Sequence, residues 1–381
     1  MKILILSSDI GTTAPGIVYE RLIEGLSTKH DIDLVTADFN PSSDLNSVKK
    51  IIEIKGTIIP TRVHKFLFTL FGINPFDLLW SRKVIRVLKN SNDTKYDLIF
   101  SFISYNHYAA LICSKKITNR NKIKHFVYSV DAIPAPLGWL KGDLYFKKTK
   151  KLITRLLANV EGIFLANQKM LEYQLNIVNP KNKIATGVIF NPSYGKLQTL
   201  DFTGGETNTF LYTGGIYGPR KVCFVLEAFT EILKEYPDST LEFVGSTIPE
   251  SNLNFLTKTE RSQVIIHPFT KDLTHFYERA TALLDIDADL ENDIFLSSKI
   301  TNYITINRII ISETGVNSPS RTLFKNIPSI VQCLHDKEML TKAMRYAIQQ
   351  RDSISFKDRA EVITLFDLET VTEKINNEIC K

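Results

Sequence analysis

Residues 282–304 read ALLDIDADLENDIFLSSKITNYI, which predicts an apolar strand, an acidic loop and a helix that begins at a turn of small residues. The first residues of a helix have free backbone N–H groups and carry the positive end of the helix dipole. The hydroxyls of Ser297 and Ser298 and the ammonium of Lys299 add hydrogen-bond donors and a positive charge to this helix N-terminus. The segment therefore predicts a diphosphate site. A serine in this place is also typical of an ordinary helix N-cap.

The chain has 381 residues, enough for two domains, and its 44% hydrophobic and 23% charged residues are ordinary for a globular protein. No apolar run reaches the roughly 18 residues that cross a bilayer, and the apolar start at residues 3–6 is too short for a signal peptide. The four cysteines lie far apart, without a CxxC pair, which favours reduced thiols over disulfides or zinc. We therefore expect a cytoplasmic protein.

Strands and helices alternate along the first half, and the alternation starts again at Thr209, which is typical of parallel, doubly wound sheets. The predicted fold class is α/β, with one Rossmann-like domain over 1–190 and another over 209–355. A linker is expected over 191–208 and a C-terminal helix over 356–381. The expected strands are 2–7, 33–37, 57–60, 97–103, 125–130, 162–166, 209–213, 240–244, 263–266, 282–287 and 308–312. The expected helices are 15–29, 78–90, 105–117, 143–159, 168–175, 221–236, 271–280, 298–305, 335–349 and 357–379.

A glycine turn follows the first predicted strand of each half. In the first turn, Gly11 and Gly16 let the backbone approach a ligand closely, or form an ordinary tight turn. Their spacing differs from that of dinucleotide sites, and no Gly-Lys-Ser/Thr of a P-loop follows. The second turn, 213–221, ends in Arg220 and Lys221 before a helix. Cations there oppose the helix dipole, which a bound anion would offset, although solvated surface charge is the alternative.

In their order and spacing these features resemble the GT-B glycosyltransferases, most of all the retaining family 4. The shared features are the Pro15-Gly16 helix entry, the Gly214-Gly215 turn followed by Arg220-Lys221, the Val244-Gly245 strand end and the Ser297-Ser298-Lys299 helix start. The resemblance implies two Rossmann-like domains facing a cleft, with the last helix crossing back to the first domain. It implies transfer of a sugar from a nucleotide-diphosphate donor to a saccharide or lipid-linked acceptor, in surface polysaccharide synthesis.

The resemblance also implies site residues in the second domain, and it implies no cofactor and no metal, because cations and the helix dipole neutralise the leaving diphosphate. It places the diphosphate at Gly215, Arg220, Lys221, Ser297, Ser298 and Lys299, the nucleoside at His267, Pro268, Phe269 and Asn302, and the donor sugar at Glu291 and Asp293.

The chain departs from the family at two positions. Ile216 stands where the family usually has Arg or Lys, and Asn302 stands where a carboxylate commonly binds ribose. An amide can still hydrogen-bond ribose, but the charge is lost. The alternative is therefore a non-catalytic GT-B-like protein that binds a nucleotide or a partner. A dinucleotide oxidoreductase, with Gly11, Gly16 and Asp38 in the Rossmann roles, fails on glycine spacing and leaves the second turn unexplained.

The acidic loop 285–293 also imitates metal sites. Its spacing resembles a calcium loop, but Leu290 and Leu296 stand where Gly and Glu are needed. It also imitates the D-x-D manganese motif of a different glycosyltransferase fold. We favour a polar loop over the donor, with metal binding as the alternative.

In the first half, Asp131 and His107 are the catalytic candidates. Asp131 follows the predicted strand 125–130, and the carboxyl ends of parallel strands are where such sheets bind ligands. Its carboxylate could orient or deprotonate an acceptor hydroxyl, or simply cap a proline turn. His107 follows the predicted strand 97–103 and could equally begin a helix.

The first half is basic. Residues 1–190 hold 27 Lys and Arg against 15 Asp and Glu, a net charge of +12, which leaves −6 for the rest of the chain. The segments 62–71 and 139–155 mix aromatic and basic residues, which is typical of surfaces that bind anionic lipids. Solvated helix faces, or a lysine-rich coding bias, are the alternatives. No segment resembles a nucleic-acid-binding module, so the expected partner is an anionic membrane surface, with the protein peripheral on the inner face of the plasma membrane.

Overall fold

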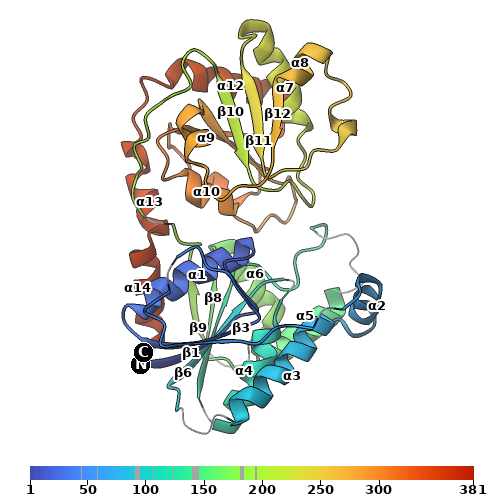
Figure 1. Cartoon of the computed structure of the whole chain (residues 1–381), viewed down its shortest axis with the longest axis vertical. Helices are drawn as coiled ribbons and strands as arrows, with labels where there is room; N and C mark the ends of the chain where they lie inside the picture. The colour runs from blue at the N-terminus through green and yellow to red at the C-terminus, as the bar shows by residue number, and fades with distance from the viewer. Residues whose placement is uncertain are drawn as a thin grey trace. The chain divides into compact units, whose positions relative to one another are not determined.

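The computed structural model describes residues 1–43, 45–57, 59–90, 95–105, 107–121, 123–139, 146–180, 184–193 and 195–381. The chain divides into two compact units (Figure 1). The first is Met1–Pro192 with Asp367–Lys381, and the second is Ser193–Phe366. Most of the segment expected as a linker thus belongs to the second unit, where Gln198 bridges to Ile306 and the backbone of Leu200 donates to the Asn307 side chain at 2.9 Å.

The first unit is built on a parallel sheet whose strands follow the order β5-β3-β1-β6-β7-β8-β9 in the described part of the chain. Its inner strands are apolar and buried along nearly their whole length, as expected for a parallel sheet with helices on both faces. The strands are β1 Lys2–Leu6, β3 Asp31–Thr36, β5 Lys50–Glu53, β6 Leu98–Ile103, β7 Lys124–Ser129, β8 Gly162–Leu165 and β9 Ala185–Val188, with β2 Asp9–Ile10 and β4 Asp38–Phe39 pairing separately. The helices are α1 Ala14–Ser27, α2 Thr61–Phe71, α3 Pro75–Asn90, α4 Ala109–Asn121, α5 Phe146–Leu157, α6 Gln168–Val178 and α14 Leu368–Ile379.

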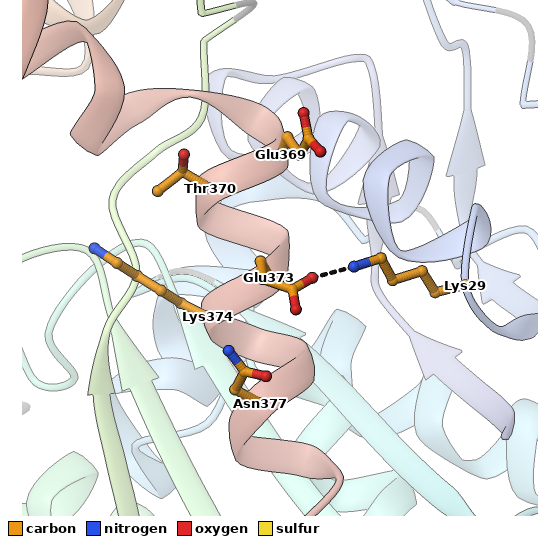
Figure 2. Close-up of a pocket in the computed structure, with 6 residues that line it drawn as sticks. All are labelled: Lys29, Glu369, Thr370, Glu373, Lys374 and Asn377. Carbon is orange, nitrogen blue, oxygen red and sulfur yellow. Dashed lines mark hydrogen bonds and ion pairs between the residues drawn. The ribbon is translucent and has the colours of Figure 1, made fainter.

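The last helix, α14, packs against α1 in the first unit. Glu373 forms an ion pair with Lys29, and His30 lies 3.0 Å from the Asn376 side chain. Figure 2 shows the hollow beside this contact, with Glu373 directed towards Lys29 and Lys374 on the other side of α14. Charged side chains of both signs line the hollow, and α14 is held there by packing and the Lys29–Glu373 ion pair.

The second unit has a parallel sheet in the order β12-β11-β10-β13-β14-β15, again counted over the described residues. Its main apolar core lies between one face of the sheet and helices α7 and α12. The strands are β10 Thr209–Thr213, β11 Thr240–Val244, β12 Val264–His267, β13 Ala282–Ile286, β14 Ile309–Glu313 and β15 Ile330–Cys333. The helices are α7 Cys223–Glu235, α8 Lys258–Ser262, α9 Thr274–Arg279, α10 Ser298–Tyr303, α11 Pro319–Leu323, α12 Lys337–Gln350 and α13 Ala360–Phe366, with short 3-10 turns at Glu250–Asn252 and Lys357–Arg359.

The predicted α/β class with two doubly wound sheets is confirmed. One predicted strand, 57–60, is wrong, because the edge strand is β5 at Lys50–Glu53; Ile58 itself lies outside the described residues. The elements that were not predicted are helices α2, α8 and α11 and strands β2, β4, β9 and β15. The predicted helix 143–159 is α5 from Phe146 onwards, and residues 140–145 lie outside the described part. No helix within the described ranges is long and apolar enough to cross a bilayer.

Candidate functional site

The strand order of the second unit places two loops beside each other. Chain connections leave β10 and β13 in opposite directions, so the carboxyl ends of these neighbours form the topological switch point, where doubly wound sheets bind ligands. The glycine turn follows β10 and the acidic loop follows β13. The two motifs singled out from the sequence therefore meet in one place.

Arg220 and Asp287 join these two loops. The Nε and Nη2 atoms of Arg220 lie 3.2 and 3.0 Å from Oδ1 of Asp287, and the two side chains are only 5% and 1% exposed. The guanidinium also stacks on Tyr217, 4.6 Å from the ring centre. Burial would lower the pKa of Arg220, but the Asp287 carboxylate more than offsets this and raises it. Arg220 lies three residues before the start of α7 at Cys223. Its position is fixed by the Asp287 carboxylate.

Lys299 is the second cation of the site. Its ammonium lies over the Tyr212 ring, 5.0 Å from the centre, and its Cε would be 3.4 Å from a Cβ at Gly214. Gly214 has φ +92°, a conformation that favours glycine, so this turn can pass close to the lysine. Burial lowers the pKa of Lys299 to about 8, with the Arg220 charge acting in the same direction. An anion bound here would raise this pKa again and so keep the ammonium charged at higher pH.

Buried carboxyl groups form the floor of the site. The Ser297 hydroxyl donates to Oδ1 of Asp285 at 2.6 Å, while Oδ2 has no hydrogen-bond partner among the described residues. Burial raises the pKa of Asp285 to about 6, and the neighbouring Asp287 adds to the shift. Glu313, at the end of β14, is 1% exposed with no partner in the described structure for either carboxyl oxygen, and burial raises its pKa well above the usual range. Three carboxyl groups thus lie close to one another, and Asp287 is the one that is paired with a cation.

Helix α10 is shorter than the predicted 298–305 and is fixed by a buried tyrosine. The Tyr303 hydroxyl accepts from the backbone N–H of Thr213 at 2.8 Å and lies 2.9 Å from its side-chain hydroxyl. The helix spans six residues, so its dipole is small and most of the attraction for an anion must come from Lys299 and Arg220. The Ser297 hydroxyl donates its hydrogen bond to Asp285 and does not cap the helix. Ser298 is exposed.

The carboxylates of the acidic loop do not converge on one point. Asp287 binds Arg220, Asp285 binds Ser297, Asp293 accepts from the Phe295 backbone at 3.2 Å, and Glu291 is exposed. Across the described ranges, no group of three or more His, Cys, Asp or Glu side chains is arranged to hold a metal ion.

The expected nucleoside residues follow β12 or lie on α10. Phe269 is 74% exposed, and its ring lies 3.3 Å from where a Cβ on Gly245 would be, so it offers a face for stacking. His267 is instead engaged with Glu242, its Nε2 lying 2.9 Å from the carboxylate. Pro268 and Asn302 are exposed, as are Gly215 and Lys221 of the expected diphosphate set.

In the first unit, Asp131 lies just after β7. It accepts a hydrogen bond from the backbone N–H of Tyr105 at 3.3 Å. Burial raises the pKa of Asp131 to about 6, which suits a group that takes up a proton near neutral pH. Its place at the carboxyl ends of β6 and β7 is the one predicted.

His107 is held by a residue that the sequence did not single out. Its Nδ1 lies 3.4 Å from Oδ1 of Asp77 on α3, which is fully buried and also accepts from the Tyr108 backbone at 2.8 Å. Burial lowers the pKa of His107, but the Asp77 carboxylate outweighs this and raises it overall. Asp77 lies just before the predicted helix 78–90, and only the structure places it in the first turn of α3.

In the first glycine turn, both glycines lie in contact with neighbouring residues of the same unit. A Cβ at Gly16 would lie 2.3 Å from a carboxylate oxygen of Asp9, which also accepts from the backbone of Thr12 and Thr13. Gly11 has φ +76° and would bring a Cβ to 2.3 Å from the Asn40 carbonyl. Both glycines are therefore required by contacts inside the unit.

No family model and no curated protein sequence matches the chain. Solved structures do match it over its full length. HepE of Anabaena, in complex with UDP and glucose, has a TM-score of 0.69 and 12% identity, with 100% of both chains covered. The lipopolysaccharide outer core galactosyltransferase WaaB has a TM-score of 0.65 and 14% identity, covering 100% of this chain and 99% of that one. The chain is also similar to a putative UDP-N-acetylglucosamine 2-epimerase of Listeria monocytogenes, with a TM-score of 0.60, 11% identity and coverage of 99% and 95%. At these identities the likeness shows the GT-B fold.

Proposed function

We propose that this chain is a retaining glycosyltransferase of the family 4 kind, which moves a sugar from a nucleotide-diphosphate donor to a saccharide or lipid-linked acceptor in surface polysaccharide synthesis. The observation that carries the proposal is the pair of cations, Arg220 and Lys299, at the switch point of the second unit. Arg220 is already paired with Asp287, whereas Lys299 forms no ion pair within the described part of the chain, and its burial makes the charge costly unless an anion accompanies it. A diphosphate supplies that anion.

Different residues of the second unit bind different parts of the donor. Lys299 and Arg220 stabilise the charge that builds on the diphosphate as the sugar leaves, and need no metal to do so. The exposed ring of Phe269 stacks on the base, and Asn302 hydrogen-bonds the ribose. Glu291 and Asp293 contact hydroxyls of the donor sugar.

In the first unit, Asp131 orients the acceptor hydroxyl and takes its proton, for which a pKa of about 6 is suitable. His107, with its orientation set by Asp77, is a second group that can move a proton at the acceptor. Both assignments follow the division of labour in which the first domain binds the acceptor.

Two neighbouring surfaces of the first unit favour an acceptor held at an anionic membrane. Helix α2 exposes Val63, Phe66 and Leu70 at 46%, 65% and 50%. The start of α5 lies beside it, because the Lys148 ammonium donates to the Leu70 carbonyl at 2.8 Å. Apolar side chains next to the exposed lysines of α5 match the boundary between acyl chains and anionic headgroups. The enzyme would then be peripheral on the inner face of the plasma membrane.

The alternative is a GT-B-like protein that binds a nucleotide or a partner without catalysis, favoured by Ile216 and Asn302. Incubation with UDP-, GDP- and dTDP-sugars separates the possibilities. Slow release of nucleoside diphosphate, lost in Lys299→Ala, supports a transferase, whereas binding without any release favours the non-catalytic protein. Conversion of the sugar while it stays on the nucleotide would assign the chain to epimerase chemistry instead.

A further inference from the structure

A second polar groove lies in the second unit, away from the switch point. It is a cavity of about 420 Å³ along β10, β11 and β12, and it reaches the first residues of β10 and β11, Thr209 and Thr240. The switch point lies at the opposite, carboxyl ends of these strands. Its lining includes Thr203, Thr207, Thr209, Thr240, Glu242 and Arg279, together with His267 at the end of β12, one of the expected nucleoside residues.

Glu242 is an unusual residue for its place. It lies in the middle of β11, in a parallel sheet, and is 4% exposed, whereas the strands of such sheets are normally apolar on both faces. A buried carboxylate destabilises a fold unless it is paired. Its Oε2 accepts from a terminal nitrogen of Arg279 and from Nε2 of His267 at 2.9 Å. Such a departure from local rules is characteristic of binding sites.

Arg279 still has a hydrogen bond to give. It ends the short helix α9, stacks on Phe276 at 4.6 Å and offers one nitrogen to Glu242. Its Nε is buried and has no hydrogen-bond partner among the described residues. Helix α9 spans six residues, and beyond it this face of β11 and β12 stays open as the groove. The groove therefore combines a partly exposed guanidinium with a carboxylate that can accept more bonds.

The lining also carries hydroxyls, two of which, on Thr209 and Thr240, lie 3.1 Å apart. A ligand with two neighbouring hydroxyls can accept from a terminal nitrogen of Arg279, whose side chain is 31% exposed, and donate to Glu242. A negatively charged ligand is repelled by Glu242 and a positively charged one by Arg279. We infer that this groove binds a neutral saccharide through a pair of adjacent hydroxyls, at a site distinct from the diphosphate site at the switch point. The inference holds whether or not the chain is a transferase.

Methyl NMR of the full chain tests the site directly, because the groove carries four threonine methyls and the Ile265 methyl. The probes are glucose, galactose, N-acetylglucosamine and methyl mannoside, which differ in the orientation of adjacent hydroxyls. Glucuronate tests the exclusion of charge, and a permethylated glucoside lacks the hydroxyls. We expect at least one neutral probe to shift the groove methyls saturably, with millimolar affinity and with UDP already present, and neither control to do so.

Glu242→Gln keeps the shape of the side chain and removes its charge, so the affinity should fall by roughly tenfold or more. Thr240→Val is a second variant that removes one hydroxyl, should Glu242→Gln fail to fold. The matched control is Thr230→Val on α7, which makes the same change on the other side of the sheet. The inference is overturned if no probe shifts the groove methyls, if shifts appear only at the carboxyl ends of the strands, or if the permethylated glucoside binds equally well. Equal binding by the wild type and the groove variants overturns it as well.

Discussion

The Nη2 atom of Arg220 lies 3.0 Å from Oδ1 of Asp287, and this buried ion pair joins the turn after β10 to the loop after β13. The pair spans the topological switch point of the second unit. It holds the guanidinium in one position before any ligand arrives, so an anion meets a cation whose conformational freedom has already been lost. Asp287 thereby acts as an internal counter-ion.

Arg220→Ala should destabilise the second unit by about 3–5 kcal/mol, because the substitution leaves the Asp287 carboxylate buried without its partner. Changing both residues, Arg220→Ala with Asp287→Ala, should restore much of that loss. Urea denaturation of the two single variants and the double variant measures the coupling. Additive losses would mean that the ion pair contributes nothing to stability.

Affinity for a nucleotide sugar should fall as the pH rises through about 8, where Lys299 loses its proton. Below about pH 6 the protonation of Asp285 removes a negative charge, so affinity should rise further. A UDP-sugar is the suitable ligand, since its diphosphate diester does not titrate in this range. Calorimetry from pH 5.5 to 9 measures the profile.

Lys299→Arg is the control for this profile. Arginine stays charged throughout the range, so the decline above pH 8 should disappear while the change near pH 6 remains. A decline that persists in Lys299→Arg would place the titrating group elsewhere.

Turnover should survive EDTA, because Arg220 and Lys299 already supply positive charge to the leaving group. The carboxylates of the acidic loop are each engaged or exposed separately. Activity that disappears in EDTA and returns with manganese or magnesium would assign the acidic loop to a metal.

Several strands could be predicted closely because of their composition. The predicted strands 209–213 and 240–244 coincide with β10 and β11: β10 has an apolar centre between two threonines, and β11 is mostly apolar apart from Glu242 and ends before Gly245. The edge strand β5 was misplaced, because three of its four residues are charged or exposed and no buried run marks it. The strand was predicted at 57–60 instead because apolar residues lie there.

The site was predictable in its loops but not in its pairings. The glycine turn and the small-residue turn before Lys299 carry local signals, whereas Asp287 gave no hint of its contact with Arg220, 67 residues away. Tyr303 and Asp77 were missed for the same reason, since each is defined by a tertiary contact. The sequence analysis also assigned too large a dipole to helix α10, which was predicted over 298–305 and spans only Ser298–Tyr303.

The first unit should bind vesicles that contain anionic lipid, and added salt should weaken the binding, since the Debye length is only about 8 Å at physiological ionic strength. Replacing the exposed Lys147, Lys150 and Lys151 of α5 with Ser should reduce it further. Lys148 is left unchanged because its ammonium bonds the Leu70 carbonyl. Flotation of vesicles measures the binding.

The matched control removes three exposed lysines of the second unit, by Lys258→Ser, Lys271→Ser and Lys325→Ser. This variant should float like the wild type. An equal loss of vesicle binding in both variants would mean that net charge, and not the surface of α5, causes the binding. If the wild type does not float at low salt, the acceptor is water-soluble.

The most direct test of the central claim is calorimetric titration of UDP into the wild type, Lys299→Ala and Lys258→Ala. Loss of a charge-assisted hydrogen bond costs about 1.5–3 kcal/mol, so Lys299→Ala should bind UDP roughly ten- to a hundredfold more weakly. Lys258→Ala, which removes an exposed lysine of α8, should bind like the wild type. Should Lys299→Ala bind UDP as tightly as the wild type, or should the wild type bind neither UDP nor any other nucleoside diphosphate, the switch point of the second unit is not a diphosphate site.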